Sequence, residues 1–194
     1  MEPDKIQLTI KQAAKDLFRK YGYHKTSVNE IARKAKIAKA TIYKYFDSKE
    51  VVLKAIVMDY LTVAIHDLMQ HPHPNLNKYE RISRLLMQTS RLSYTVCNEF
   101  IGWEFIRESV NAQEFLKNLS DDLETLIIDS FIENDEFARD PENIQSIRFL
   151  VKSSKSIVFS FAFTSVTVAD VKKNFIIFEK ELLPFLVNSA LKNY

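Results

Sequence analysis

Apolar residues recur along most of the chain at the three- and four-residue intervals of a helix. In residues 6–21, this apolar face is accompanied by a separate basic face that carries Lys11, Lys15 and Arg19. The pattern predicts an amphipathic helix that buries one side. Gly22 follows directly and can take the left-handed conformation in which helices commonly end.

Two short helices and one longer helix are predicted next. Ser27 and Glu30 have the spacing of a capping box, so a helix is expected directly after Ser27. Residues 38–46 again show helical spacing and predict a third helix. Asp47 or Ser48 then caps a fourth helix, whose apolar stripe is much longer.

The second part of the chain follows an interruption by two prolines within residues 71–75. Because proline lacks an N–H donor, this segment is expected to be a linker. The clearest helix start beyond it is Asp140-Pro141, an N-cap followed by proline at the first helical position. Further helices are expected at roughly 77–96, 99–109, 111–134, 141–165 and 168–191.

The last two predicted helices are apolar on more than one side. A helix that is apolar all round is buried all round. We therefore expect these two helices to pack both on the body and on a second copy, in a four-helix interface with two-fold symmetry. The alternative is a plain core in a monomer.

The composition favours an all-α protein. Among 194 residues, 46% are apolar, but only two are glycine and five are proline. Sheet-rich folds need turn residues at short intervals, and glycine-rich dinucleotide and phosphate loops need several glycines close together. The single Cys97 excludes an internal disulfide and a cysteine-rich zinc site. His66, His71 and His73 lack the further ligands of a tetrahedral set, so no metal or other cofactor is expected.

The chain is expected to be a soluble, cytoplasmic protein without a membrane partner. Its first residues are acidic, unlike the basic start of a signal peptide. Its longest uncharged stretch, residues 156–169, has 14 residues, fewer than the ~20 that a helix needs to cross a bilayer.

Charge is divided unevenly along the chain. Residues 1–50 contain 12 Lys and Arg against 6 Asp and Glu, whereas residues 51–194 contain 15 against 19. A basic first part on an acidic remainder suggests that the first part binds a polyanion such as nucleic acid. The alternative is a solvated helical face, which is what lysine-rich stretches usually form.

Residues 26–49 have the pattern of a helix-turn-helix, in which two brief helices are joined by about four residues. In that motif the second helix enters the major groove of DNA, and its first turn meets the base edges. Here this turn carries Lys39, Ala40 and Thr41, and Lys44 follows one turn later.

Other side chains of the motif suit the DNA backbone or the protein core. Tyr43 and Tyr45 offer hydroxyls to phosphates, and Lys49 adds a cation beside the backbone N–H groups that begin the fourth helix. Ile42 and Phe46 are expected to face inward. The two tyrosines differ by about 200° around a helix, so at least one lies outside the buried face. Their alternative role is core packing.

Several short groups of residues in this part of the chain stand at fixed distances from one another. They are Ile6-Gln7-Leu8-Thr9-Ile10, Ala13-Ala14, Leu17-Phe18, Tyr21-Gly22-Tyr23, Thr26-Ser27-Val28, Ile31-Ala32, Ala40-Thr41-Ile42-Tyr43-Lys44-Tyr45-Phe46 and Ser48-Lys49-Glu50. Through them, residues 5–65 resemble the TetR family of transcriptional repressors. The chain departs from the family pattern at Lys36, where glycine is common, and at Ala38, where serine is frequent. Each departure costs roughly 1 kcal/mol.

The resemblance implies an all-α homodimer of about nine helices per chain. An N-terminal three-helix helix-turn-helix head, residues 5–65, would be joined by the long fourth helix to a helical ligand-binding and dimerisation body, residues 66–194. The implied function is a transcriptional regulator, a ligand-released repressor that binds a palindromic operator of double-stranded DNA. Lys39, Ala40, Thr41 and Lys44 would face the bases, and Thr26 or Ser27, Tyr43, Tyr45 and Lys49 would contact phosphates, which Lys36 could also reach.

The middle of the body combines aromatic and sparse polar side chains, which is typical of a small-molecule pocket and equally of any helical core. The candidate pocket residues are Arg91, Tyr94, Asn98, Trp103, Phe105, Arg107 and Phe115. The expected inducer is apolar or aromatic, with an arginine contact only if it carries an anion. No pairing of nucleophile and base stands out, so an enzyme is not expected. The alternative function is a helical ligand- or partner-binding protein whose DNA-binding head is degenerate, as Lys36 and Ala38 would indicate.

Overall fold

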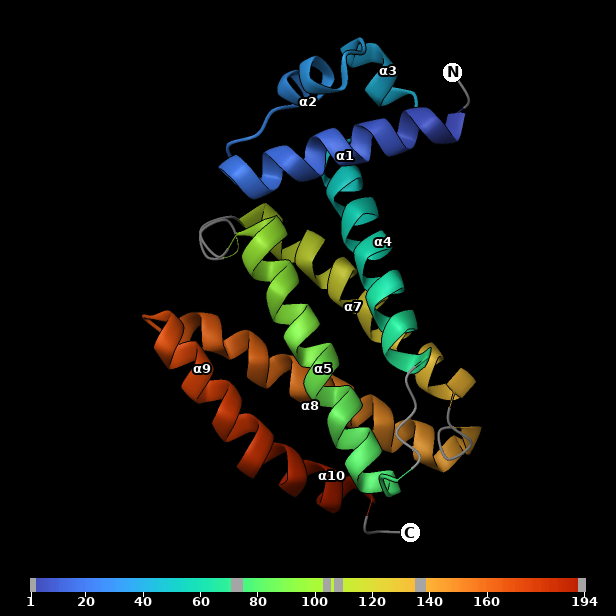
Figure 1. The fold of residues 1–194 in the computed structure, drawn as a ribbon, viewed down its shortest axis with the longest axis vertical. Helices are drawn as coiled ribbons and strands as arrows, with labels where there is room; N and C mark the ends of the chain where they lie inside the picture. Colours follow the sequence, from blue (N-terminus) through green and yellow to red (C-terminus); the bar gives the residue numbers. More distant parts are fainter. Residues whose placement is uncertain (1–2, 71–74, 103–105, 107–109, 135–138, 192–194) are drawn as a thin grey trace. The chain divides into compact units, whose positions relative to one another are not determined.

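A computed structural model describes residues 3–70, 75–102, 106, 110–134 and 139–191. These described residues form helices joined by turns and contain no strand, which confirms the predicted all-α class (Figure 1). When each unbroken helical run is counted once, they form eight helices, close to the nine expected.

The chain divides into two compact units. The first unit consists of Met1–Leu61 and Thr95–Ser120, and the second consists of Thr62–Tyr94 and Asp121–Tyr194. Both units therefore combine segments that are far apart in the sequence. The division into functional domains at residue 65 stays a prediction.

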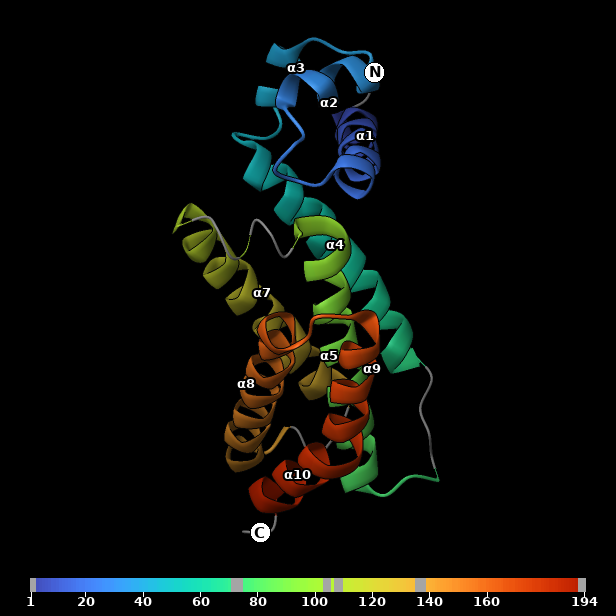
Figure 2. The same cartoon turned by 90° about the vertical axis from the view of Figure 1, so that its left-hand side faces the viewer.

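The first unit contains the helices of the predicted head, α1 (Pro3–Tyr21), α2 (Val28–Ala35) and α3 (Lys39–Tyr43). Figure 2 looks almost along α1 and shows α2 and α3 beside it. Gly22 ends α1 as expected, with φ +86° and its N–H bonded to the Phe18 carbonyl at 2.9 Å. The buried core of these helices and of the first turns of α4 (Lys49–Gln70) includes Ile10, Ala14, Phe18, Ile31, Ile42, Phe46, Val52 and Leu53.

The third helix is shorter than its apolar spacing predicts. It ends at Tyr43, and the following turn is closed by hydrogen bonds from Tyr45 N–H and Phe46 N–H to the Ile42 carbonyl, at 3.0 and 2.9 Å. The chain therefore keeps winding as far as Phe46, which remains on the buried side. Ser48, one of the two expected caps, precedes α4 and accepts a hydrogen bond from Val51 N–H at 3.3 Å.

The helix predicted at 99–109 is only partly within the described residues. Residues 103–105 and 107–109 lie outside them, as do residues 71–74 of the predicted linker. Residues Cys97–Ile101 form a π-helical turn, η1, that continues α5 (Lys78–Val96). Gly102 stops this turn with φ +89°, and its N–H bonds the Cys97 carbonyl at 2.9 Å.

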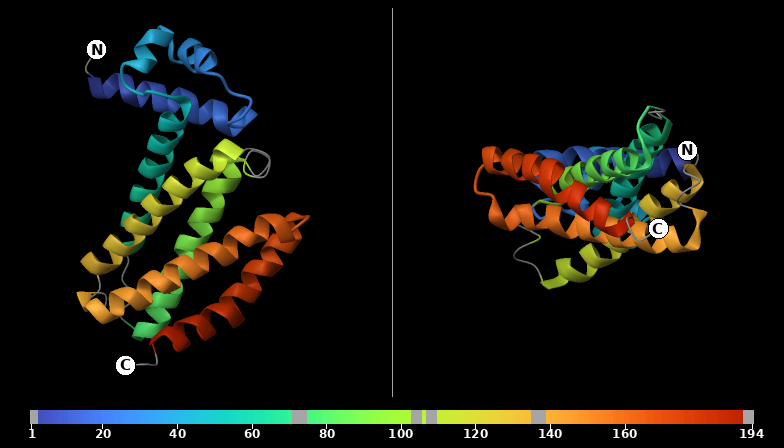
Figure 3. Two further views of the ribbon diagram at one scale, coloured as in Figure 1. Left: turned by 180° about the vertical axis from the view of Figure 1, so that it is seen from behind. Right: turned by 90° about the horizontal axis from the view of Figure 1, so that it is seen from below.

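The second unit includes α8 (Pro141–Thr164), which starts as expected, because Asp140 Oδ1 accepts from Glu142 N–H at 2.9 Å. The chain then returns antiparallel through α9 (Val168–Ile177), η3 (Phe178–Leu182) and α10 (Leu183–Leu191) (Figure 3). Ser146 of α8 donates to the Ala190 carbonyl of α10 at 3.2 Å. α7 (Val110–Asn134) also contributes its larger part to this unit.

The run predicted as one helix at 168–191 contains a π-helical turn just before Pro184. Proline has no N–H, and its ring clashes with the carbonyl four residues earlier in a regular α-helix. One extra residue in the preceding turn removes that conflict while the helix continues.

Within the described part of the chain, no helix has both the length and the apolarity that crossing a bilayer requires.

Replacing the residue between α2 and α3 tests the backbone strain there. Lys36 has φ +55°, a region that costs a residue with a Cβ about 1 kcal/mol. Lys36→Gly should therefore raise the melting temperature by roughly 2–4 °C, measured by circular dichroism. Arg33→Gly, within α2, should instead destabilise the protein by about 1 kcal/mol. An unchanged or lower melting temperature for Lys36→Gly would show that this conformation is unstrained.

Candidate DNA-binding surface

The helix-turn-helix consists of a capped α2, a left-handed turn and an uncapped α3. Ser27 Oγ accepts from Glu30 N–H at 3.2 Å, and the Glu30 carboxylate accepts from Ser27 N–H at 2.7 Å. The predicted capping box is therefore confirmed. Lys36 occupies the left-handed position after α2, and Ala38 precedes α3 without a side-chain cap hydrogen bond. The two departures from the family pattern thus correspond to a positive φ at Lys36 and to a missing side-chain cap at Ala38.

α3 buries one narrow stripe and exposes most of its remaining surface. Ile42 and Phe46 are 1% and 5% exposed, as their spacing predicts, whereas Tyr43 is 45% exposed. Of the other predicted contact residues on this element and its turn, Lys36, Lys39, Ala40 and Lys44 are exposed, and Thr41 and Tyr45 are half-buried. The Lys39 ammonium lies 5.8 Å from the centroid of the Tyr43 ring. α3 therefore presents cations and a tyrosine together on its outer side.

The two residues before α2 use their hydroxyls within the head. Thr26 is 3% exposed, and its hydroxyl donates to the Gly22 carbonyl at 2.9 Å. Ser27 is exposed, but its hydroxyl donates to the Glu30 carboxylate at 2.8 Å. Hydrogen bonds from the backbone and hydroxyl of Ser27 hold the pKa of Glu30 below its usual value. An ionised carboxylate therefore lies at the start of α2.

Lys49 is directed into the head from the first turn of α4. Its ammonium donates to the carbonyl oxygens of Tyr23 at 3.0 Å and Thr26 at 2.9 Å. It also lies 4.1 Å from the centroid of the Tyr23 ring. Two of the three ammonium donors are thus used inside the head. Desolvation lowers the pKa of Lys49, although the nearby Glu50 and Glu30 carboxylates oppose that shift.

Tyr23 joins the same cluster and was not among the predicted site residues. Tyr23 is 1% exposed, and its ring packs edge-on against that of Phe18, with 5.3 Å between the ring centroids. Its hydroxyl donates to Glu50 Oε1 at 2.6 Å. Burial raises the pKa of Tyr23, and the hydrogen bond to Glu50 adds to that effect. The residue stands between Gly22 and the capping box, so no helical period singles it out.

The Glu50 carboxylate of this cluster is stabilised in its charged form. Partial burial alone would raise the pKa of Glu50, but hydrogen bonds from Tyr23, from its own backbone and from Ser48 outweigh that effect and lower it. The attraction of Lys49 acts in the same direction. The first turn of α4 thus supplies a cation and an anion, and both contact the phenol ring or hydroxyl of Tyr23 in the loop between α1 and α2.

The predicted pocket residues are divided between the two units. In the second unit, Arg91 is exposed and pairs with Glu179 at 3.3 Å, while the ring of Tyr94 packs edge-on against that of Phe175 at 5.5 Å. In the first unit, Asn98 is exposed and Phe115 is half-buried. Trp103, Phe105 and Arg107 lie outside the described residues. Whether these residues share one pocket stays a prediction.

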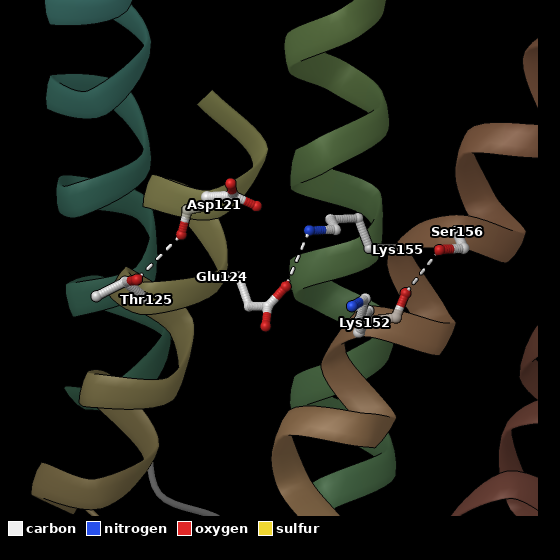
Figure 4. Close-up of polar contacts among 6 residues, drawn as sticks. All are labelled: Asp121, Glu124, Thr125, Lys152, Lys155 and Ser156. Carbon is white, nitrogen blue, oxygen red and sulfur yellow. Dashed lines mark hydrogen bonds and ion pairs between the residues drawn. The ribbon is translucent and has the colours of Figure 1, made fainter. Parts of the chain in front are cut away.

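The second unit contains polar groups that are buried or partly buried. Lys155 of α8 and Glu124 of α7 form an ion pair at 3.1 Å, with each side chain 20% exposed (Figure 4). Ser154 is 2% exposed, and within the described part of the chain its hydroxyl has no hydrogen-bond partner. Gln88 Oε1 of α5 is also buried and has no hydrogen-bond partner among the described residues.

The described residues offer neither a metal site nor a reactive thiol. No group of three His, Cys, Asp or Glu side chains among them is placed to hold a metal ion; His71 and His73 lie outside that part of the chain. Burial raises the pKa of the Cys97 thiol to about 12. At neutral pH this thiol is therefore protonated and unreactive.

The head matches known sequences over a short segment. The family model described as bacterial regulatory proteins, tetR family, matches residues 10–56. The A-factor receptor protein of Streptomyces griseus is 41% identical over 49 residues, which cover 25% of this chain and 18% of that protein. The uncharacterized HTH-type transcriptional regulator YuxN of Bacillus subtilis (strain 168) is 46% identical over 57 residues, 29% of this chain and 19% of that protein. The match thus spans about a fifth of the length of each curated relative.

Solved structures resemble the chain over nearly its whole length. Salmonella enterica GusR has a TM-score of 0.63 at 18% identity, covering 99% of this chain and 98% of its own. RolR in complex with resorcinol has a TM-score of 0.55 at 13% identity, covering 95% and 93%. FadR from Bacillus subtilis in complex with stearoyl-CoA has a TM-score of 0.53 at 16% identity, covering 93% and 97%. At these identities the likeness shows a shared fold. The family match covers residues 10–56, and over this segment the chain resembles the tetR family of bacterial regulatory proteins.

Proposed function

We propose that the protein is a cytoplasmic transcriptional regulator that binds a palindromic operator as a homodimer and is released by a small molecule. The observation that carries the DNA-binding part is the geometry of α3. This helix and the turn that follows it bury Ile42 and Phe46 and expose Lys39, Tyr43 and Lys44. A short helix with cations and hydroxyls on its outer side suits the major groove and its flanking phosphates.

The proposed contacts follow the exposure of each side chain. Lys39, Ala40, Thr41 and Lys44 would face base edges, and Ser27, Lys36, Tyr43 and Tyr45 would contact phosphates. Thr26 is not part of this set, because its hydroxyl is buried and donates to Gly22. The excess of basic residues in residues 1–50, 12 against 6 acidic ones, favours the approach of DNA to this unit.

We also propose that the last two helical runs form the dimer interface. The exposed apolar side chains there include Phe149, Phe163, Val168, Ile176, Leu182 and Phe185. Apolar surface of this extent, on helices that already bury their other face in the second unit, is typical of an interface. A two-fold pairing covers the same patch on both copies.

The body, residues 66–194, is proposed to bind an apolar or aromatic ligand that also carries a polar group. Two structures with this fold contain small molecules, resorcinol in RolR and stearoyl-CoA in FadR. In this chain, the buried Ser154 hydroxyl and Gln88 Oε1 lack partners among the described residues. A buried polar atom without a hydrogen bond costs about 1–3 kcal/mol, which a ligand group could recover. Such a ligand would release DNA only by binding more tightly to the state with lower DNA affinity.

A second candidate function is a ligand- or partner-binding protein with a degenerate head. It is favoured by the positive φ of Lys36 and by the missing cap at Ala38. Selection of bound duplexes from a random-sequence pool at low ionic strength separates the two functions. Enrichment of an inverted repeat supports the regulator, whereas the absence of any bound duplex supports the degenerate head.

Removing one proposed phosphate contact should weaken binding to every duplex. Lys36→Gly is expected to flatten the slope of log affinity against log salt by about one, because one fewer counterion is released. Fluorescence anisotropy with a labelled duplex measures this slope. Lys152→Ala, at an exposed position in α8, should leave it unchanged. An unaltered slope for Lys36→Gly would exclude its phosphate contact.

A charge placed in the proposed interface should separate the subunits. Phe185 is 70% exposed on α10, and burying a glutamate there without a partner is strongly unfavourable. Phe185→Glu is therefore expected to sediment as a single 22.6 kDa chain, while the parent protein sediments as a dimer. Leu8→Glu, at an exposed apolar position in α1, should remain dimeric. A dimeric Phe185→Glu variant would place the interface elsewhere.

A further inference from the structure

The loop between α1 and α2 is fastened to the first turn of α4 by side-chain contacts. Tyr23 of this loop is buried, and its hydroxyl donates to Glu50 Oε1 at 2.6 Å. From the same turn of α4, the Lys49 ammonium donates to the carbonyls of Tyr23 and Thr26, at 3.0 and 2.9 Å. These contacts join residues that are 23 to 27 positions apart in the sequence.

The Lys49 ammonium is held from several directions. Two of its three donors are used by the carbonyls, and the face of the Tyr23 ring lies 4.1 Å from it. An ammonium over an aromatic ring gains further electrostatic stabilisation when it is partly desolvated. To reach a phosphate directly, Lys49 would have to give up two charge-assisted hydrogen bonds, which are among the stronger ones.

The position of these carbonyls determines where α2 begins. Thr26 directly precedes Ser27, the N-cap of α2. Thr26 is also bonded to the residues that directly follow α1, because its N–H donates to the Tyr23 carbonyl at 3.2 Å and its hydroxyl donates to the Gly22 carbonyl at 2.9 Å. The only residues between α2 and α3 are 36–38. The start of α2 therefore controls the placement of the recognition helix.

We infer that Lys49 is a positioning residue of the DNA-binding head, not a phosphate ligand, and that with Tyr23 and Glu50 it ties the helix-turn-helix to the first turn of α4. This inference rests on the proposed DNA binding. It assigns Lys49 a different role from the one that the family resemblance implies.

The salt dependence of DNA binding distinguishes positioning from phosphate contact. Lys49→Met keeps the length of the side chain and removes its charge. We expect about tenfold weaker binding to a duplex selected by the parent protein, with an unchanged salt slope. Lys36→Gly, which removes an exposed lysine that is proposed to contact a phosphate, should flatten the slope by about one. If Lys49→Met flattens the slope as Lys36→Gly does, or binds like the parent, the inference is wrong.

Two further variants guard against a purely local defect at position 49. Tyr23→Phe removes only the hydroxyl that donates to Glu50, and should weaken binding with the parent salt slope. Lys49→Arg retains the charge and several donors, and should restore most of the affinity that Lys49→Met loses. Parent-like binding by Tyr23→Phe, or an Arg variant as weak as the Met variant, would contradict the assignment.

Hydrogen exchange of the protein without DNA provides a readout that does not depend on the proposed function. Peptides that cover residues 22–36 should exchange faster in Lys49→Met and Tyr23→Phe than in the parent protein, because α2 is less firmly held. In Lys44→Met, which removes an exposed lysine of the same motif, they should exchange at the parent rate. Unchanged exchange in both cluster variants would overturn the inference even if no duplex were bound. Faster exchange without any DNA binding by the parent would instead reject the proposed function alone.

Discussion

The head depends on the burial of Ile42 and Phe46. α3 has five residues and no side-chain cap, and a helix of that length has almost no stability of its own in water. Its conformation is therefore maintained by the apolar contacts that these two side chains make in the core of the first unit. The same burial decides which side chains point outward. Fixing one stripe inside leaves Lys39, Tyr43 and Lys44 on the outer side.

Two features of the chain next to α3 lower the stability of the folded state: the positive φ of Lys36 and the missing side-chain cap at Ala38. Lys36 adopts a left-handed conformation that glycine would adopt without strain. α2 is well capped by Ser27 and Glu30, but α3 begins at Ala38 with no comparable bond. The stability that holds the turn must then come from packing and from the contacts at the start of α4. The head thus combines a strained backbone at Lys36 with side-chain contacts that hold the loop before α2 to the first turn of α4.

The second unit has an apolar core that also contains polar groups. The inner stripe of α8 is buried along its length, yet it includes Ser154 with an unpartnered hydroxyl. Lys155, one residue later, pairs with Glu124 across to α7. An ion pair that is largely removed from water adds little net stability, because desolvation offsets the attraction. The Lys155–Glu124 ion pair therefore contributes little to the stability of the fold.

The sequence alone predicted most of the helices and several of their ends. The signals at Ser27 with Glu30, at Gly22 and at Asp140-Pro141 act within four residues, so they can be recognised without knowledge of the fold. The sequence also predicted the third helix and its buried stripe, because Ile42 and Phe46 are four residues apart and share one helical face. The π-helical turn before Pro184 arises from local chemistry too, but apolar periodicity does not detect it, since the helix continues.

Only the tertiary structure decided the partners of Thr26, Lys49 and Tyr23. A period in the sequence says which face a side chain occupies, but not which group on another element meets it. Lys49 has the charge and position of a phosphate ligand, yet its carbonyl partners lie 23 and 26 residues earlier in the chain. Likewise, the Thr26 hydroxyl is withdrawn from the surface by the fold of the loop that it closes. Contacts between distant segments depend on how the helices pack, and that information is not contained in any local pattern.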